Sequence, residues 1–159
     1  VLKRMEMKLD LIKNVDVVLA HENETGIYGY SAEHCADLAG TLVSPKFRLA
    51  FDSGNFVWGQ NDADCMTTCW PIMKPYVAHV HIKDWALGAK IGSMPGEGDG
   101  QIPELLKALH EMDYDGFITM EPHLQVGGQF GGYTGPDLYS KAIAAVRRIA
   151  AEAGFAEIG

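Results

Sequence analysis

The segment Tyr76-Val-Ala-His-Val-His-Ile-Lys83 has the pattern of a β-strand with two different faces. Val80 and Ile82 fall on one face of an extended chain, where they can pack under helices. The polar side chains fall on the opposite face: His79, His81 and Lys83. We therefore predict a strand whose polar face lines the interior of a closed sheet.

Three further apolar runs resemble this one, and an amphipathic stretch follows each of the four runs. The four predicted strands cover residues 15–22, 47–52, 76–83 and 117–121. Four helices are predicted after these strands. The first contains Cys35 to Leu42 and is capped by Ser31, and the second contains Cys65 to Met73 and is capped by Asp62 or Asp64. The third contains Leu105 to Met112, and the fourth begins near Pro136 and is stopped by Gly154. Another helical stripe precedes them at Leu2, Met5, Leu9 and Ile12. This alternation of strands and helices is typical of an α/β protein with a parallel sheet.

Two α/β architectures compete for this pattern. A doubly wound sheet usually has a Gly-rich turn after its first strand, but His21-Glu-Asn-Glu24 stands at that place. A (β/α) TIM-type barrel instead ends its strands in polar residues at the mouth, and here the strands end in Glu, Asp, His and Glu. We favour the barrel. Because a complete barrel needs at least about 200 residues, we expect residues 1–159 to form half of one.

The composition excludes several classes of protein. With 13 basic and 21 acidic residues the net charge is -8, which makes nucleic acid and anionic membranes unlikely partners. No apolar segment is long enough to span a bilayer, and the first residues do not resemble a signal peptide. Three cysteines are too few for a disulfide framework. We expect a soluble, cytoplasmic protein.

The four strand ends carry possible metal ligands: Glu22, Asp52, His81 and Glu121. They lie roughly 30 to 40 residues apart, about one strand–helix unit each, so each sits on its own strand. In a barrel these ends meet at one mouth, where three carboxylates and an imidazole suit Mn²⁺ or Mg²⁺, with Co²⁺ or Zn²⁺ as alternatives. By spacing alone, solvated loop residues or helix caps explain the pattern about as well.

Five segments resemble the xylose isomerase-like TIM-barrel superfamily of sugar phosphate isomerases and epimerases: Leu19–Glu24, Ala50–Asn55, His79–Asp84, Pro95–Gly100 and Tyr114–Pro122. The resemblance covers nearly the whole chain and maps it to strands five to eight of that barrel. It implies that Glu22, Asp52, His81 and Glu121 are the metal ligands. It also implies an isomerase or epimerase acting on a small sugar, polyol or sugar phosphate through a metal-stabilised enediolate, with Glu22 and Glu121 as the catalytic acid and base.

Five further residues are predicted to contact the substrate: Asn55, His79, Lys83, Trp85 and Glu97. Each has a structural alternative. Asn55 could cap the next segment, His79 could be a satisfied core histidine, and Lys83 could pair with Asp84 or Glu97. Two Gly-rich segments, 96–100 and 127–132, could offer backbone N–H groups to a phosphate, although a lid or a plain turn explains them better.

Other functions on the same scaffold stay open. Ketose 3-epimerases of the superfamily usually have a His where this chain has Asn55. A lyase that dehydrates its substrate could use the same metal site. A non-catalytic half barrel that binds or assembles is the third possibility. We expect either a homo-oligomer or association with a missing N-terminal half, because an open half sheet leaves two edges unpaired.

Overall fold

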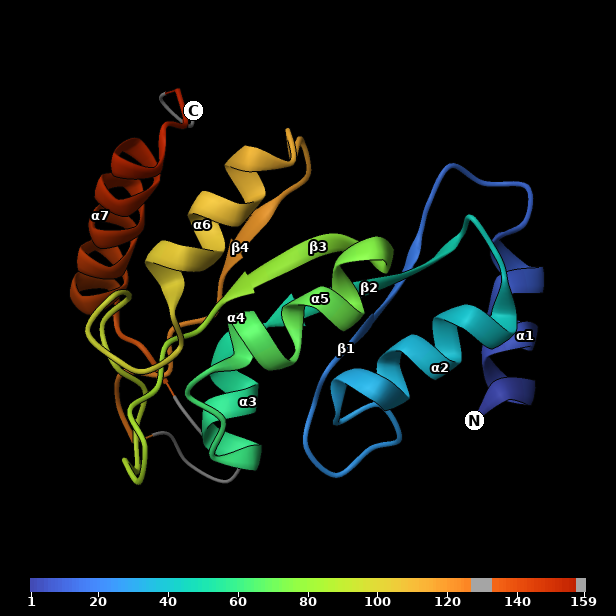
Figure 1. Ribbon diagram of the computed structural model, residues 1–159, viewed down its shortest axis with the longest axis horizontal. Coiled ribbons are helices and arrows are strands. Elements are labelled where there is room, and N and C mark those ends of the chain that lie inside the picture. The colour runs from blue at the N-terminus through green and yellow to red at the C-terminus, as the bar shows by residue number, and fades with distance from the viewer. Residues whose placement is uncertain (127–132, 157–159) are drawn as a thin grey trace.

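The computed structural model describes residues 1–126 and 133–156, and its centre is one parallel β-sheet. The strand order along the sheet is the order along the chain: β1 (Leu19–Glu22), β2 (Phe47–Asp52), β3 (Val77–Ile82) and β4 (Ile118–Met120). Figure 1 shows these strands with their helices around them. The predicted α/β class and the four parallel strands are confirmed.

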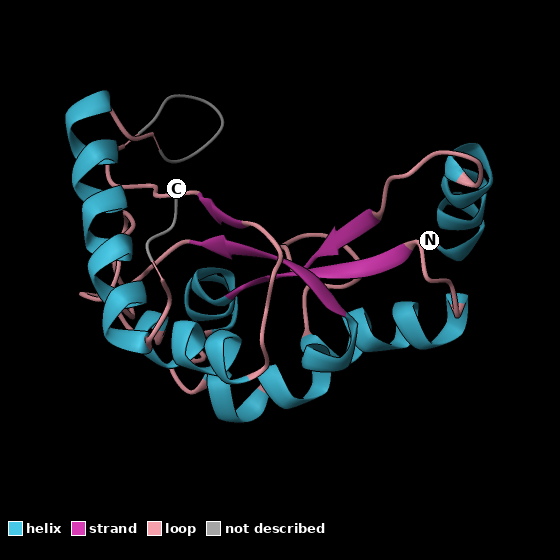
Figure 2. Cartoon of the chain, turned by 90° about the horizontal axis from the view of Figure 1, so that it is seen from above, coloured by secondary structure: helices cyan, strands magenta, loops and turns pink. Residues whose placement is uncertain are grey.

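Helices precede, connect and follow the strands. They are α1 (Leu2–Ile12), α2 (Ala32–Leu42), α3 (Ser53–Gln60), α4 (Cys65–Thr68), α5 (Trp70–Met73), α6 (Ile102–Glu111) and α7 (Pro136–Ala153), with a short 3₁₀ turn η1 (Lys74–Tyr76). Figure 2 shows most of them along one face of the strands, with α1 and α7 at the two ends. No helix in the described parts of the chain is long and apolar enough to cross a membrane.

Side-chain chemistry explains where several helices begin and end. Ser31 caps α2 by accepting a hydrogen bond from the His34 N–H, as predicted. The α7 helix begins at Pro136 and ends at Gly154, whose φ of 102° is readily available only to glycine. The segment predicted as one helix through Cys65 and Met73 is divided into α4 and α5 around Cys69. Pro71, at the beginning of α5, explains the break because it has no N–H to continue the helix of the preceding residues.

The helix α3 was not predicted from the sequence. Two of its eight residues are Gly54 and Gly59, so it has no continuous apolar stripe. It begins directly after β2, and the Asp52 Oδ1 accepts a hydrogen bond from the Asn55 N–H at 3.1 Å. Asp52 is therefore the last residue of β2 and caps α3 through Oδ1. Its second carboxylate oxygen, Oδ2, is not used by the cap.

The core lies between the sheet and the helices that cover it. Val80 and Ile82 are fully buried there, while His79 and His81 are partly exposed on the opposite face, as the alternation in β3 predicts. All three cysteines are buried and free: Cys35, Cys65 and Cys69. Burial is the largest of the causes that raise the pKa of the Cys35 thiol to about 12, so this side chain behaves as a small apolar group.

Both edges of the sheet are open in the described parts of the chain. There β1 pairs only with β2, and β4 pairs only with β3. A cavity of about 510 Å³ lies beside the open edge of β4, between this strand and α7. Its lining is largely apolar and includes Ile118, Val146 and Phe155. This cavity is space into which a further strand could fit.

Candidate metal centre

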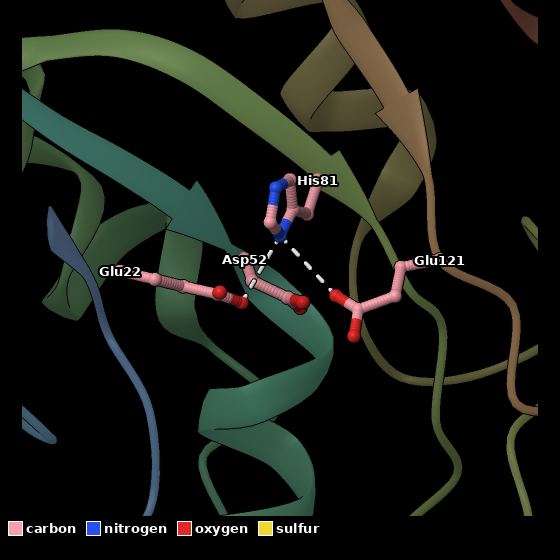
Figure 3. Close-up of side chains that lie close together, drawn as sticks. All are labelled: Glu22, Asp52, His81 and Glu121. Atoms are coloured by element: carbon pink, nitrogen blue, oxygen red, sulfur yellow. Dashed lines mark ion pairs between the residues drawn. The ribbon is translucent and has the colours of Figure 1, made fainter. Parts of the chain in front are cut away.

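Four strand ends converge on one point at the carboxyl edge of the sheet. Glu22 ends β1, Asp52 ends β2, His81 is the fifth of six residues in β3, and Glu121 directly follows β4. One potential ligand atom from each lies within 4.8 Å of all the others. Figure 3 shows the side chains pointing toward a common centre. The structure thus brings together all four residues that the sequence singles out as ligands.

The His81 imidazole lies between two carboxylates. Its Nδ1 is 3.1 Å from Glu22 Oε1 and 3.2 Å from Glu121 Oε2. Figure 3 shows the two glutamates approaching this nitrogen from opposite sides. Hydrogen bonds to Glu121 and Glu22 raise the pKa of His81 to about 10, so the ring carries a proton when no metal is bound. A bound metal would take the place of this proton.

The three carboxylates differ in their environments. Burial raises the pKa of Asp52 to about 7, although the nearby Lys83 ammonium acts in the opposite direction. Burial would also raise the pKa of Glu121, but its contacts with His81 and Lys83 lower it to about 2. Glu121 is therefore negatively charged over the physiological range, as a ligand of a divalent cation must be.

Three of the facing atoms are buried and meet only the charged groups of the cluster itself and Lys83: Asp52 Oδ2, His81 Nδ1 and Glu121 Oε2. Removing charged atoms from water costs free energy unless opposite charges compensate for it. Two carboxylate oxygens and an imidazole nitrogen are suitable donors for a hard or borderline divalent cation. The residues present therefore fit the metal that the sequence suggests.

The Lys83 side chain also reaches this cluster. Its ammonium lies 3.1 Å from Asp52 Oδ2 and 3.3 Å from Glu121 Oε2, and it donates a hydrogen bond to Asn55 Oδ1 at 3.0 Å. Only 3% of the residue is exposed. The alternative pairing of Lys83 with Asp84 or Glu97 is not what the structure has, and its contact with substrate remains a prediction.

Asn55 is also buried beneath the cluster. Its side-chain amide donates hydrogen bonds of 3.0 Å to Glu22 Oε1 and to the backbone oxygen of Asn23. Together with its bond from Lys83, these contacts let Asn55 orient Glu22. The predicted contact between Asn55 and a substrate is not tested by these distances.

Asn23 supports the site and was not identified from the sequence. It is fully buried, and its side chain exchanges two hydrogen bonds with the backbone of Asp52, at 2.8 and 2.9 Å. These bonds extend the pairing of β1 and β2 beyond the last strand residue. They hold Glu22 and Asp52 side by side. The sequence did contain a signal for this role, because Asn23 is a polar residue directly after Glu22, a predicted ligand at a strand end.

Two further residues that were predicted to contact the substrate, His79 and Trp85, lie near His81 in the sequence. The His79 ring is 5.1 Å from the His81 ring, and its Nε2 lies 2.9 Å from Thr119 Oγ1. Trp85 is buried, donates a hydrogen bond from its indole to the Ala89 oxygen and lies 6.0 Å from the exposed Trp58 ring. The contacts of His79 and Trp85 are consistent with either a packing or a substrate-binding role.

Glu97 belongs to a loop that is organised by Asp84. Asp84 Oδ2 accepts hydrogen bonds from Gly96 and Gly98 at 2.8 and 3.0 Å, and Oδ1 accepts from Trp85 and Gly100, both at 2.9 Å. The backbone donors considered for a phosphate are therefore occupied by a carboxylate of the chain. The Glu97 side chain is exposed, and in the described parts of the chain it has no hydrogen bond or ion pair with the cluster. The other Gly-rich segment, 127–132, lies outside the described residues.

His123 contributes one more contact at the rim. Its Nε2 lies 3.4 Å from Glu121 Oε1, the oxygen that does not face His81. Burial lowers the pKa of His123 below its usual value, so this ring is largely neutral at neutral pH. It can orient Glu121 without adding a second positive charge.

Comparisons with known proteins agree with this fold. The family model described as xylose isomerase-like TIM barrel matches residues 1–149. The chain therefore belongs to the xylose isomerase-like TIM-barrel family. A comparison with curated protein sequences finds no match.

Several solved structures share the fold at low sequence identity. A D-allulose 3-epimerase from Methylomonas sp. superposes with a TM-score of 0.72 at 15% identity, covering 93% of this chain and 54% of that one. A 3-keto-D-glucoside 4-epimerase from E. coli gives 0.68 at 14%, covering 92% and 52%. A probable 3-DHS dehydratase from Bacillus anthracis gives 0.68 at 14%, covering 91% and 53%. The chain thus spans about half the length of the structures that it resembles.

Proposed function

We propose that this chain provides the metal-binding side of a sugar isomerase or epimerase, with Glu22, Asp52, His81 and Glu121 as the ligands of one divalent cation. The observation that carries the proposal is the convergence of four ligand atoms, from four successive strands, within 4.8 Å. The family supports an enzyme of this kind because its solved members include sugar epimerases.

The proposed reaction removes a proton from a carbon of an α-hydroxy carbonyl compound and returns a proton to the same or to the neighbouring carbon. A divalent cation held by the four residues supplies Lewis-acid stabilisation of the negative charge that develops on the substrate oxygens. Glu22 and Glu121 approach from opposite sides (Figure 3), so one can accept the proton and the other can return it. Return to the neighbouring carbon on the same face gives isomerisation, and return to the original carbon on the opposite face gives epimerisation.

The remaining polar residues prepare these two glutamates. Asn55 holds Glu22 by a hydrogen bond, and Lys83 and His123 contact the two oxygens of Glu121. Groups fixed in this way lose little conformational freedom when substrate binds. His79, Trp85 and Glu97 remain candidates for contacts with a carbohydrate substrate, and a cytoplasmic location remains part of the proposal.

A dehydratase is the second candidate. It is favoured by the structural similarity to a probable 3-DHS dehydratase, which equals the similarity to the 3-keto-D-glucoside 4-epimerase. A dehydratase could use the same carboxylates to remove a proton, with loss of a hydroxyl group instead of proton return. Mass spectrometry of the product separates the two reactions, because an isomer keeps the mass of the substrate and a dehydration product has lost water.

The first test is the metal content of the purified chain and of Asp52→Ala. We expect near-stoichiometric Mn, Mg, Co or Zn in the unchanged chain and its loss in the variant. Absence of metal from both, even after soaking, would refute the metal centre and favour a non-catalytic half barrel that binds or assembles.

The second test is turnover on a panel of ketoses, inososes and sugar phosphates. Glu22→Gln and Glu121→Gln should each abolish activity at saturating metal, because glutamine accepts no proton. Glu104→Gln, at an exposed position of the first turn of α6, is the matched control and should keep full activity. Normal activity in either site variant would remove that carboxylate from the mechanism.

A further inference from the structure

Lys83 is a buried cation within a site that is suited to bind a cation. Its ammonium lies 3.1 Å from Asp52 Oδ2 and 3.3 Å from Glu121 Oε2, which are two of the atoms that face the proposed metal. Removing a lysine charge from water is costly unless opposite charges compensate for it. Here the carboxylates of Asp52 and Glu121 do so.

The first turn of α3 is shaped to admit this side chain. A Cβ atom at Gly54 would lie 2.5 Å from the Lys83 carbonyl oxygen and 2.8 Å from Lys83 Cγ. Both separations are shorter than contacts that real side chains adopt. The hydrogen bond from Lys83 to Asn55 Oδ1, one residue further along α3, then fixes the ammonium. Backbone and side chains together hold the charge of Lys83 at one place.

The charges at the site can be counted from these contacts. Glu22, Asp52 and Glu121 contribute three negative charges when ionised, and Lys83 contributes one positive charge. With a neutral His81 as ligand, the site keeps two negative charges, which one divalent cation balances. Without Lys83, the same ligands would match a trivalent cation or would attract a second metal ion.

We propose that Lys83 sets the charge of the metal site, neutralising one carboxylate so that the site selects a single divalent ion. This inference rests on the proposed function, because it requires that the four ligands bind a metal. Lys83 acts here as a positioning residue: it contacts Asp52 and Glu121 and works through them.

The test compares Mn²⁺ and Tb³⁺ as probes of the full chain, by calorimetry and by Tb³⁺ luminescence. The variants are Lys83→Met and Lys83→Gln, and Lys107→Met, at an exposed position of α6, is the control. We expect one Mn²⁺ per unchanged chain. In both Lys83 variants the ratio of the dissociation constants should shift at least tenfold toward Tb³⁺, while Lys107→Met keeps the original ratio.

The selectivity ratio distinguishes the charge effect from simple damage to the site. A distorted site binds both ions more weakly, so the ratio of the two dissociation constants changes little. An unchanged ratio in a folded Lys83 variant would overturn the inference while leaving the metal centre intact. Two Mn²⁺ ions of similar affinity in the unchanged chain would also overturn it, even if neither variant folds. Failure of the unchanged chain to bind either ion would instead refute the proposed metal site itself.

Discussion

The substitution Asp84→Asn probes how the loop between β3 and α6 is held. Asp84 is 1% exposed, and its two oxygens accept four backbone hydrogen bonds, two each. Asparagine has the same shape but only one acceptor oxygen. Its NH₂ group would face two N–H donors, from Gly96 and Gly98 or from Trp85 and Gly100, and would leave both without an acceptor.

The size of the effect follows from these unpaired donors. A buried N–H that loses its acceptor costs about 1–3 kcal/mol, so two give roughly 2–6 kcal/mol. Part of this loss is offset, because burial raises the pKa of Asp84 and a neutral amide has a smaller desolvation cost. We therefore expect the free energy of unfolding to fall by about 2–4 kcal/mol, a large share of the roughly 5–15 kcal/mol of a typical domain.

Urea unfolding at pH 7, monitored by tryptophan fluorescence and by circular dichroism, measures this difference. Asp99→Asn is the matched control: in the same loop, Asp99 Oδ2 accepts one hydrogen bond, from the Leu87 N–H at 2.8 Å. The control should lose less than about 1 kcal/mol, since an asparagine oxygen can still accept that bond. If Asp84→Asn is as stable as the control, the four bonds do not hold the loop as we describe.

Three further predictions concern other parts of the chain. His81 is proposed to bind the metal as the neutral imidazole, and its pKa is raised to about 10. Mn²⁺ binding at pH 8 should therefore release about one proton, and its affinity should rise about tenfold per pH unit below that pKa. Calorimetry in buffers of different ionisation enthalpy measures both, and pH-independent binding would contradict the assignment. The open edges of β1 and β4, with Phe117 81% exposed beside the β4 cavity, should make the isolated chain self-associate, and a monodisperse monomer by light scattering would count against this. Ser31→Ala should lower the free energy of unfolding by about 1 kcal/mol through loss of the α2 cap, as measured by urea unfolding, whereas no change would show that the cap contributes nothing.

Local patterns in the sequence were sufficient to predict most of the fold. The alternation in residues 76–83 and the apolar run 47–52 identified β3 and β2 nearly to the residue. The predicted strand 15–22 was longer than β1, because its first residues connect α1 to the sheet and are exposed. The helix α3 was missed since its glycines are present for close packing against Lys83 and Thr25, contacts that no local pattern reveals.

The four proposed ligands could be predicted from the sequence, but the residues that hold them in place could not. Parallel strands place their ends at one edge of the sheet, so the position of a residue at a strand end is enough to bring Glu22, Asp52 and His81 together. The partners of Lys83 come from β2 and from the residue after β4, and only the folded chain shows that its ammonium reaches them. Likewise, the glycines of the 96–100 segment suggested a lid or a plain turn, and only the folded chain shows that Asp84 fixes three of them.

The sequential strand order has a consequence for how the chain folds during synthesis. Leu19 pairs with Phe47, Leu49 with Val77 and Val80 with Ile118, so every strand joins the strand made just before it. In the described parts of the chain each strand pairs with its neighbour in the sequence, which keeps the loops to be closed as short as a parallel sheet allows. A nascent chain can add one strand at a time to a growing sheet. Glu121, the last of the four proposed ligands, then joins three that are already in place.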